Sequence, residues 1–564
     1  MTCIWNNCKR NIYFLATEHS AVTDKEAKPA EQTPNPGEAA KTSYKINMTL
    51  TRKGRNRLIW LGLVIGAVSG LTAVAYRLAL QGLERLRAQV IPGLDDPWSI
   101  FFYFAVLLIL GLIVCLLVKS EPLIKGSGIP QVEGQLQGYF NPRWLRVLLK
   151  KFAGGCLCIL GGLSLGREGP SIQLGALAAQ GLTEKLNLSR TDQRYLLTCG
   201  ACAGLAAAFN APLAGLMFGL EEIQKNFSSR AIFPALIASV TADVVSKLFF
   251  GTGASLGIAL PTDALPLQFY WLYLLLGPLM GLFGAFYNKV LFGLQKAYRL
   301  GPWPEWLQPL FPFVLAGVLA LFLPEVLGGG HELITGMAAE SFTLRMLLIL
   351  LVGKFAFSML SFCSGAPGGI FFPLLVLGGL VGTIFGYAAV ALGLPQEMAL
   401  RFMLLGMAGM FAAVVRAPLT GIILVLEMSA SLTQLIGLAL VAGLSWLTAD
   451  LLGARPVYEQ MLDNLTASLP KDAPAGKKEE QSIIEITLPY KSALVGKRVR
   501  DIPWPGQVLV VSIIRGNKQI MPKGDTVMES GDVLAVACYA GEEMLIRSAI
   551  DDITNWANFR EGKL

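Results

Sequence analysis

Long apolar stretches without charged residues dominate the middle of the chain. Four are continuous, Leu58–Tyr76, Phe101–Val118, Pro266–Asn288 and Met428–Ala449, and they run for 19, 18, 23 and 22 residues. An α-helix needs about 20 residues to cross the roughly 30 Å hydrocarbon core of a bilayer. The pattern therefore predicts that each of these stretches is a membrane-spanning helix.

Other apolar stretches are interrupted by glycine and proline. Phe355–Gln396 has no charge over 42 residues but contains Gly365-Ala366-Pro367-Gly368-Gly369, and Asn210-Ala211-Pro212 divides Tyr195–Leu220. Non-helical backbone is tolerated at membrane depth only where it is buried or lines a cavity. The sequence therefore predicts an all-α polytopic membrane protein in which several helices are broken.

An internal repeat relates the two halves of this region. Gly200–Glu221 aligns without gaps to Gly406–Glu427, and both copies carry A-P-L-x-G followed six residues later by Glu. Upstream, Gly166–Gly175 and Gly369–Gly378 keep Gly, Pro and Gly at the same spacing. Repeats of this kind indicate a transporter whose site lies where the halves meet.

Polar segments flank the membrane domain, which we place at residues 56–466. Residues 1–55 lack hydrophobic periodicity and are expected to form a disordered tail. We expect a linker at 467–481, a small domain at 482–550 and a C-terminal tail at 551–564. Apolar runs separated by turn residues predict strands in the small domain, starting at Ile483, Val508, Lys518 and Val533.

Composition and charge narrow the function. Only 15% of residues are charged, against about 25% in soluble proteins, and the mean hydropathy is +0.54. The chain has two histidines, His19 and His331, so we expect neither a histidine-based enzyme nor a metal site. The net charge of +8 includes Arg52–Arg57 directly before the first span. That placement indicates the cytoplasmic side of a membrane and not a nucleic-acid partner.

Three glycine-rich segments, 126–130, 166–170 and 368–373, each stand at the start of an apolar helix. A helix N-terminus offers unpaired N–H groups and about half a positive charge. Several such ends aimed at one point would bind an anion. The Ser127 hydroxyl would donate to that anion, although an ordinary helix cap is the alternative for this residue.

Two glutamates are candidates for proton handling. Glu168 lies at one of these helix starts, where its carboxylate would compete with an anion; the alternative is a structural cap paired to Arg167. Glu222 ends the apolar stretch after Pro212, where an ionisable residue is costly to bury and often relays protons. Its alternative is a position at the cytoplasmic water interface.

The motifs GSGIP (126–130), GREGP (166–170) and GGIFFP (368–373), with the duplicated APLxG helices, resemble the CLC chloride channels and transporters. The resemblance covers roughly Arg57 to Leu465. It implies an inverted-repeat fold with many tilted and broken helices, and a homodimer with one pore in each subunit. Chloride and protons would be its transported partners, and no cofactor is expected.

The resemblance also implies roles for single residues. Ser127, the backbone N–H groups of Ile370 and Phe371, and Tyr458 resemble the groups that coordinate the anion, with Tyr458 in the loosest motif. Ser127 further favours chloride over nitrate, because serine stands there in the chloride branch.

Glu168 resembles the external gate and proton acceptor, and Glu222 the internal proton-transfer glutamate that passive channels of the family usually lack. The resemblance therefore favours H⁺/Cl⁻ exchange, with a passive voltage- or pH-gated chloride channel as the alternative.

The C-terminal region resembles a TrkA-C (RCK-type) domain through Tyr490–Lys497, Pro522–Asp525 and Ser530–Asp532. Such domains are small, regulatory α+β units and suggest a prokaryotic source. A small-molecule ligand of unidentified chemistry is therefore a candidate partner. We expect a multi-pass protein of the bacterial inner membrane with both termini in the cytoplasm.

Two other classes are disfavoured by missing residues. An intramembrane hydrolase would need a base near a nucleophilic serine or a pair of aspartates. The only histidine of the membrane region is His331, and Asp243 and Asp450 stand apart in the sequence with no partner motif. A subunit for potassium uptake would need a TVGYG-like filter, which the sequence lacks.

Overall fold

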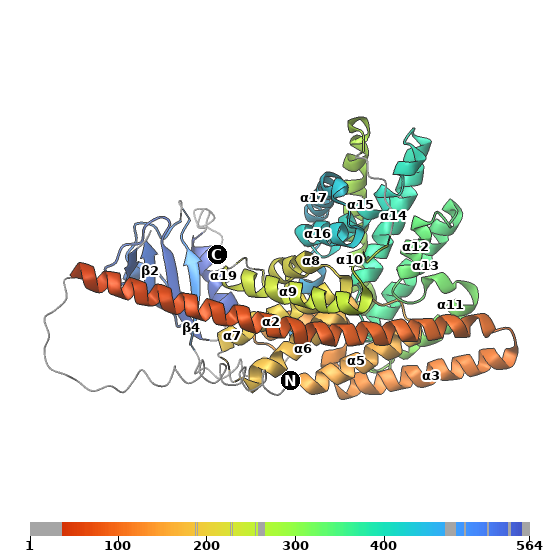
Figure 1. The fold of residues 1–564 in the computed structure, drawn as a ribbon, viewed down its shortest axis with the longest axis horizontal. Coiled ribbons are helices and arrows are strands. Elements are labelled where there is room, and N and C mark those ends of the chain that lie inside the picture. Colours follow the sequence, from red (N-terminus) through yellow and green to blue (C-terminus); the bar gives the residue numbers. More distant parts are fainter. Residues whose placement is uncertain are drawn as a thin grey trace. The chain divides into compact units, whose positions relative to one another are not determined.

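The computed structural model describes residues 36–554 except positions 187, 189, 226, 228, 254, 258–264, 468–480, 490–491, 516–517 and 540–542. Figure 1 shows a chain that is helical up to residue 466 and carries a small sheet after residue 480. The residues before Arg57 and those from Arg57 onward form two separate units. The predicted linker at 467–481 lies almost wholly outside the described residues.

Helix α2 (Pro36–Val90) begins inside the segment that we expected to be a disordered tail. The structure differs from that expectation at residues 36–55, which are helical, while residues 1–35 lie outside the described part of the chain. Proline suits the first turn of a helix because the N–H it lacks would have no partner there. No further proline interrupts the chain until Pro92.

The membrane domain consists of two runs of helices in the same order. The first run is α2, α3 (Pro97–Ser120), α4 (Ile129–Leu136), α5 (Trp144–Leu160), α6 (Glu168–Lys185), α7 (Arg190–Phe209), α8 (Pro212–Phe218) and α9 (Ser229–Phe250). The second is α10 (Trp271–Leu300), α11 (Leu310–Phe322), α12 (His331–Ala338), α13 (Leu344–Cys363), α14 (Phe371–Ala391), α15 (Arg401–Val414), α16 (Pro418–Ser429) and α17 (Leu435–Leu451). Helix α18 (Val457–Thr466) follows. The repeat seen in the sequence therefore extends over the whole domain.

The two runs share backbone details as well as order. The turn before α4 has Gly126 and Gly128 at φ 61° and 98°, and the turn before α12 has Gly328 and Gly330 at 63° and 98°. Only glycine adopts such left-handed conformations without strain. The two turns are therefore the same structure made by different sequences, GSG and GGG.

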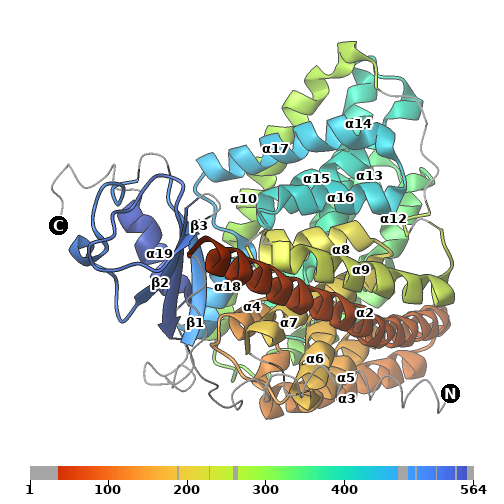
Figure 2. The same ribbon diagram turned by 60° about the vertical axis from the view of Figure 1, so that its left-hand side comes forward.

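Helices α6 and α7 pack against each other in the first run, as α14 and α15 do in the second (Figure 2). Small residues allow this closeness: Gly175 lies against the carbonyl of Gly200, and Gly378 against that of Gly406. Such contacts are typical of helices that associate in membranes. Together these helices form the buried centre of the domain.

Eight of the described helices are long and apolar enough to span a membrane. The predicted break at Gly365–Gly369 is confirmed, because α13 ends at Cys363 and α14 begins at Phe371. The continuous span predicted at Met428–Ala449 is wrong: α16 ends at Ser429, and Ala430 takes a left-handed φ of 52°. A hydroxyl group competes for the backbone there, since Ser429 Oγ donates to Val425 O at 2.7 Å and to Leu426 O at 3.4 Å in the last turn of α16.

The C-terminal domain is a four-stranded antiparallel sheet in the order β1-β4-β2-β3 with helix α19 (Glu543–Thr554) against β1 and β4 (Figure 2). The strands are β1 (Gln481–Thr487), β2 (Leu509–Arg515), β3 (Lys518–Ile520) and β4 (Val533–Tyr539). All four predicted strands are confirmed within two residues. Alternating buried side chains of β4, including Leu534 and Val536, meet Ile550 of α19 in the core of this domain.

Candidate functional site

The starts of three helices are tied together at the interface between the repeats. Gly166 N–H donates to Gly369 O at 2.6 Å, and Gly369 N–H donates to Gly166 O at 2.8 Å. Gly368 N–H donates to Gly126 O at 3.0 Å, which joins the turn before α4. The N-termini of α4, α6 and α14 therefore meet, as the three glycine-rich segments predicted, and their dipoles favour an anion at this point.

Ser127 lies at this meeting point and is 2% exposed. A Cβ on Gly169 would clash with Ser127 Oγ, so the serine rests directly against the first turn of α6. Tyr458 of α18 is near enough for the two hydroxyls to interact. Neither oxygen makes a normal hydrogen bond within the described part of the chain, although both are buried. Buried hydroxyls of this kind usually have partners, so the pair has capacity to donate to a bound ion.

Ile370 and Phe371 occupy the start of α14, and both are buried. Their N–H groups have no carbonyl partner among the described residues, as expected at a helix start. The Phe371 ring contacts Phe411, Phe209 and Phe218 at centroid distances of 4.7, 5.4 and 5.8 Å. This aromatic cluster keeps water from the helix end and so strengthens its electrostatic effect.

Glu168 begins α6 and is 1% exposed. Its carboxylate is directed at the backbone N–H of Phe372 in the first turn of α14. Arg167 Nε lies 3.8 Å from Glu168 Oε1, beyond hydrogen-bonding distance, and Glu168 Oε2 has no hydrogen-bond partner among the described residues. The carboxylate thus lies over a helix N-terminus, where a negative charge is stabilised.

Glu222 lies on a turn of π-helix, Gly219–Ile223, that continues α8, and it is buried. Its Oε1 lacks a hydrogen-bond partner among the described residues. Tyr458 is within electrostatic reach of both Glu222 and Glu168. The six residues that we singled out in the sequence therefore lie in one buried region.

Two buried lysines were not anticipated from the sequence. Lys151 Nζ donates to Ile124 O and Gly126 O at 2.9 and 2.6 Å, and Lys354 Nζ donates to Val326 O and Gly328 O at 2.9 and 2.7 Å. Lys151 of α5 thus holds the turn before α4, and Lys354 of α13 holds the turn before α12. The available signal was a cation inside an apolar helix, although α5 also carries Arg146 and Lys150 and α13 also carries Arg345.

The glutamates that end the duplicated motif act as reciprocal helix caps. Glu221 accepts from the N–H groups of Leu419 and Thr420 at the start of α16 (3.1 and 2.7 Å). Glu427 accepts from those of Leu213 and Ala214 at the start of α8 (3.0 and 2.8 Å). The sequence repeat revealed these glutamates but not their partners. Figure 1 shows α8 beside α16.

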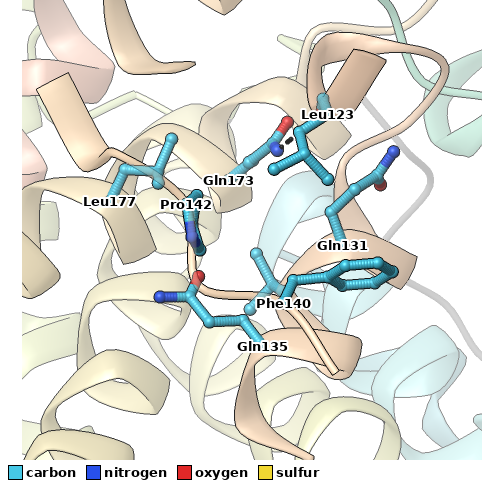
Figure 3. A pocket seen from close by; sticks show the side chains of 8 residues that line it. Leu123, Gln131, Gln135, Phe140, Pro142, Gln173 and Leu177 are labelled. Atoms are coloured by element: carbon cyan, nitrogen blue, oxygen red, sulfur yellow. Dashed lines mark hydrogen bonds between the residues drawn. The ribbon is translucent and has the colours of Figure 1, made fainter. Parts of the chain in front are cut away.

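A row of glutamines backs the Ser127 turn. A side chain at Gly128 would collide with Gln173 of α6, whose Nε2 donates to Leu123 O at 3.0 Å. Figure 3 shows Gln173 and Gln131 beside a cavity of about 10 Å³, which is the size of one water molecule. Their Oε1 atoms have no partner in the described residues. Gln173 therefore supports the backbone of the turn that carries Ser127.

Comparison with known proteins gives consistent matches. The sequence profile of the voltage gated chloride channel family matches residues 110–450, and that of the TrkA-C domain matches residues 483–550. The H(+)/Cl(−) exchange transporter ClcA of Salmonella gallinarum is 36% identical over 444 residues, covering 74% of this chain and 92% of the relative. The protein of the same name from Klebsiella pneumoniae is 35% identical over 445 residues, covering 76% and 93%.

Solved structures agree with the fold. A slow cyanobacterial Cl⁻/H⁺ antiporter superposes with a TM-score of 0.69 at 28% identity, covering 73% of this chain and 98% of that one. A CLC-type fluoride/proton antiporter gives a TM-score of 0.59 at 24% identity, covering 70% and 95%, and supports the fold alone. The inverted-repeat fold expected from the sequence is confirmed. The relatives are named as transporters, which agrees with the expectation that this chain is not an enzyme.

Proposed function

Because this chain belongs to the CLC family of chloride channels and transporters and carries a TrkA-C domain, we propose that it exchanges chloride for protons across the membrane. The observation that carries this proposal is the pair of buried carboxylates, Glu168 and Glu222, in the same region as the buried hydroxyls of Ser127 and Tyr458, which have no hydrogen-bond partner among the described residues. A passive anion pathway has no use for two buried ionisable groups, which are costly to keep in a membrane. Relatives with 36% identity are named as exchangers of the same two ions.

The anion site consists of Ser127 and Tyr458 as hydroxyl donors and the N–H groups of Ile370 and Phe371 as backbone donors. These groups supply partial positive charge and no fixed cation, so chloride is bound without being trapped. Ser127 favours chloride over nitrate. Chloride and protons are the only transported partners that the proposal requires, and it requires no cofactor.

Glu168 is the external gate in this mechanism. As a carboxylate over the α14 N-terminus it holds the position that an anion would take. Protonation removes the charge that binds it there, so the side chain leaves and chloride enters. Each cycle thereby couples proton uptake on Glu168 to chloride movement in the opposite direction.

Glu222 passes the proton between Glu168 and the opposite side of the membrane, and Tyr458 is within electrostatic reach of both carboxylates. We assign the side from which Glu222 receives protons to the cytoplasm, the side that the basic residues Arg52–Arg57 before the first span indicate for the N-terminus. Both termini then lie in the cytoplasm of a bacterial inner-membrane protein. The functional unit is a homodimer with one pathway in each subunit, and the TrkA-C domain binds a regulatory small molecule.

The test is a flux assay on purified protein in liposomes that records both ions. A chloride gradient should drive protons against their own gradient. Glu222→Gln should stop proton movement while chloride still passes, and Glu168→Gln should stop it while leaving chloride flux unregulated by pH. The exposed Glu397→Gln is the matched control and should behave as the unchanged chain. Chloride flux with no proton flux in the unchanged protein would refute exchange and indicate a channel.

A further inference from the structure

Lys225 ends the segment that carries Glu222, and its side chain reaches back to α4. Lys225 Nζ lies 3.0 Å from Glu133 Oε1, and the two side chains are 37% and 2% exposed. The lysine therefore connects water at the mouth of the site to a buried carboxylate. Glu133 lies on α4, the helix whose first turn follows Ser127.

Glu133 is in an unfavourable position for a negative charge. It lies in the last turns of α4, at the end where the helix dipole is negative. Its Oε2 has no hydrogen-bond partner among the described residues, and Gln137 Nε2 reaches Oε1 only at 3.4 Å. A buried carboxylate in such surroundings takes up a proton unless a cation is paired with it. Lys225 is the cation that pairs with it here.

Other carboxylates surround the same ammonium group. Glu459 and Asp463 of α18 act on Glu133 together with Lys225, and α18 packs against α4. Glu222 is acted on by Lys225, Glu133, Glu221 and Glu459. One lysine thus lies among several acidic groups from α4, α18 and the π-turn. Its charge decides which of them remains ionised.

The π-turn places Lys225. In each repeat, a residue with a left-handed backbone ends the segment that follows the capping glutamate. In the second repeat it is Ala430, three positions after Glu427. In the first repeat it is Lys225, four positions after Glu221. The additional residue comes from the π-turn Gly219–Ile223. Such turns and left-handed non-glycine residues cost free energy and occur often at functional sites. Ala430, the corresponding residue of the second repeat, carries no charge.

We propose that Lys225 is a positioning residue that holds Glu133 as an anion, so that protons from the cytoplasm are taken by Glu222 and not by Glu133. The inference rests on the proposed function, in which Glu222 is the internal proton carrier. Lys225 itself carries no proton in the cycle. It keeps a second carboxylate, a few residues from the chloride site, out of the proton path.

The test compares Lys225→Met, Lys225→Arg and the double variant Lys225→Met/Glu133→Gln in liposomes. Loss of an opposite charge at this distance changes the proton affinity of a carboxylate by about 1–3 pK units. We therefore expect Lys225→Met to shift the dependence of proton flux on cytoplasmic pH by about one pH unit or more and to lower proton flux about tenfold at neutral pH. Chloride flux should persist and serves as the measure of folded protein.

Lys225→Arg should keep the profile of the unchanged protein, and the double variant should regain it, because no second carboxylate is left to titrate. An unchanged pH profile in Lys225→Met, or a double variant as impaired as the single one, would overturn the inference. Glu222→Gln separates the two proposals. If it uncouples transport while Lys225→Met has no effect, only the role of Lys225 fails; if it leaves coupling intact, the proposed function fails first.

Discussion

The two repeats share their supporting residues but not the residues of the site. Lys151 and Lys354, Glu221 and Glu427, and the left-handed glycines recur in both halves with the same contacts. Where the first half has Ser127, Glu168 and Glu222, the second has Gly329, Phe371 and Met428 at the matching positions. The repeated residues build the frame, and the side chains that we propose for the gate and the proton path lie in the first repeat. The second repeat contributes backbone N–H groups, those of Ile370 and Phe371, to the proposed anion site.

The buried lysines give the largest expected effect. Lys151→Met removes the side-chain donor to Ile124 O and one of the two donors to Gly126 O, and Lys354→Met removes the side-chain donor to Val326 O and Gly328 O. Each loss of buried hydrogen bonds costs about 3 kcal/mol of the free energy of unfolding. We expect both variants to unfold at similarly lower temperatures in detergent, as measured by circular dichroism. Transport should suffer more in Lys151→Met, since only Lys151 holds the turn that carries Ser127. Equal transport defects in the two variants would mean that the frame and the site are not separable.

Ser127 sharpens the comparison within that turn. Ser127→Gly copies Gly329 of the second repeat and removes one hydroxyl donor to the anion. A hydrogen bond to a charged group contributes about 1.5–3 kcal/mol, so chloride affinity should weaken about 10- to 100-fold. Isothermal titration with chloride measures this directly. The converse variant Gly329→Ser should bind chloride as the unchanged chain does; a second binding event would contradict the asymmetry.

The reciprocal caps test the symmetry of the frame. Glu221→Gln and Glu427→Gln each weaken the acceptor for two backbone N–H groups at the start of the opposite helix. The loss of a cap costs about 1 kcal/mol, and we expect a decrease in Tm for both variants that is somewhat larger for Glu221→Gln, because Glu221 also accepts from Thr420 Oγ1. A larger decrease in Glu427→Gln would show that the two helix starts are not equivalent in energy.

The smallest effect comes from the one contact that the caps do not share. Thr420 Oγ1 also donates to Glu221 Oε2 at 2.7 Å, whereas Ala214 stands at the matching position. Thr420→Ala should cost about 0.5–1 kcal/mol. In combination with Glu221→Gln it should add little, because the acceptor is already weakened. If the decreases in Tm of Thr420→Ala and Glu221→Gln add up in the double variant, the contact between Thr420 Oγ1 and Glu221 is not the origin of the Thr420→Ala effect.

The sequence revealed the parts that depend on local pattern. Long apolar runs located most membrane helices, and glycine and proline located the breaks at Asn210–Pro212 and Gly365–Gly369. Short apolar runs between turn residues located the strands. Motif spacing also selected Ser127, Glu168 and Glu222, which the structure brings into one region. These features follow from neighbouring residues and so are readable from a single chain.

The parts that were missed depend on residues far apart in the chain. Glu221 and Glu427 were visible as a repeat, but each caps a helix about two hundred residues away. Lys225 gave no signal because four helices, α5 to α8, separate it from its partner Glu133 in the chain, and the π-turn has no sequence mark. The end of α16 at Ser429 was missed for a related reason, since the surrounding apolar run resembles one continuous span.

The reciprocal caps bear on the order in which the protein is made. A ribosome delivers Leu213 and Ala214 to the membrane long before it delivers Glu427, so α8 must wait for its acceptor while the second half is translated. Closure of the two caps is then a late event that occurs only when α16 has been inserted, and the site between the halves is complete only for a chain that has been translated in full.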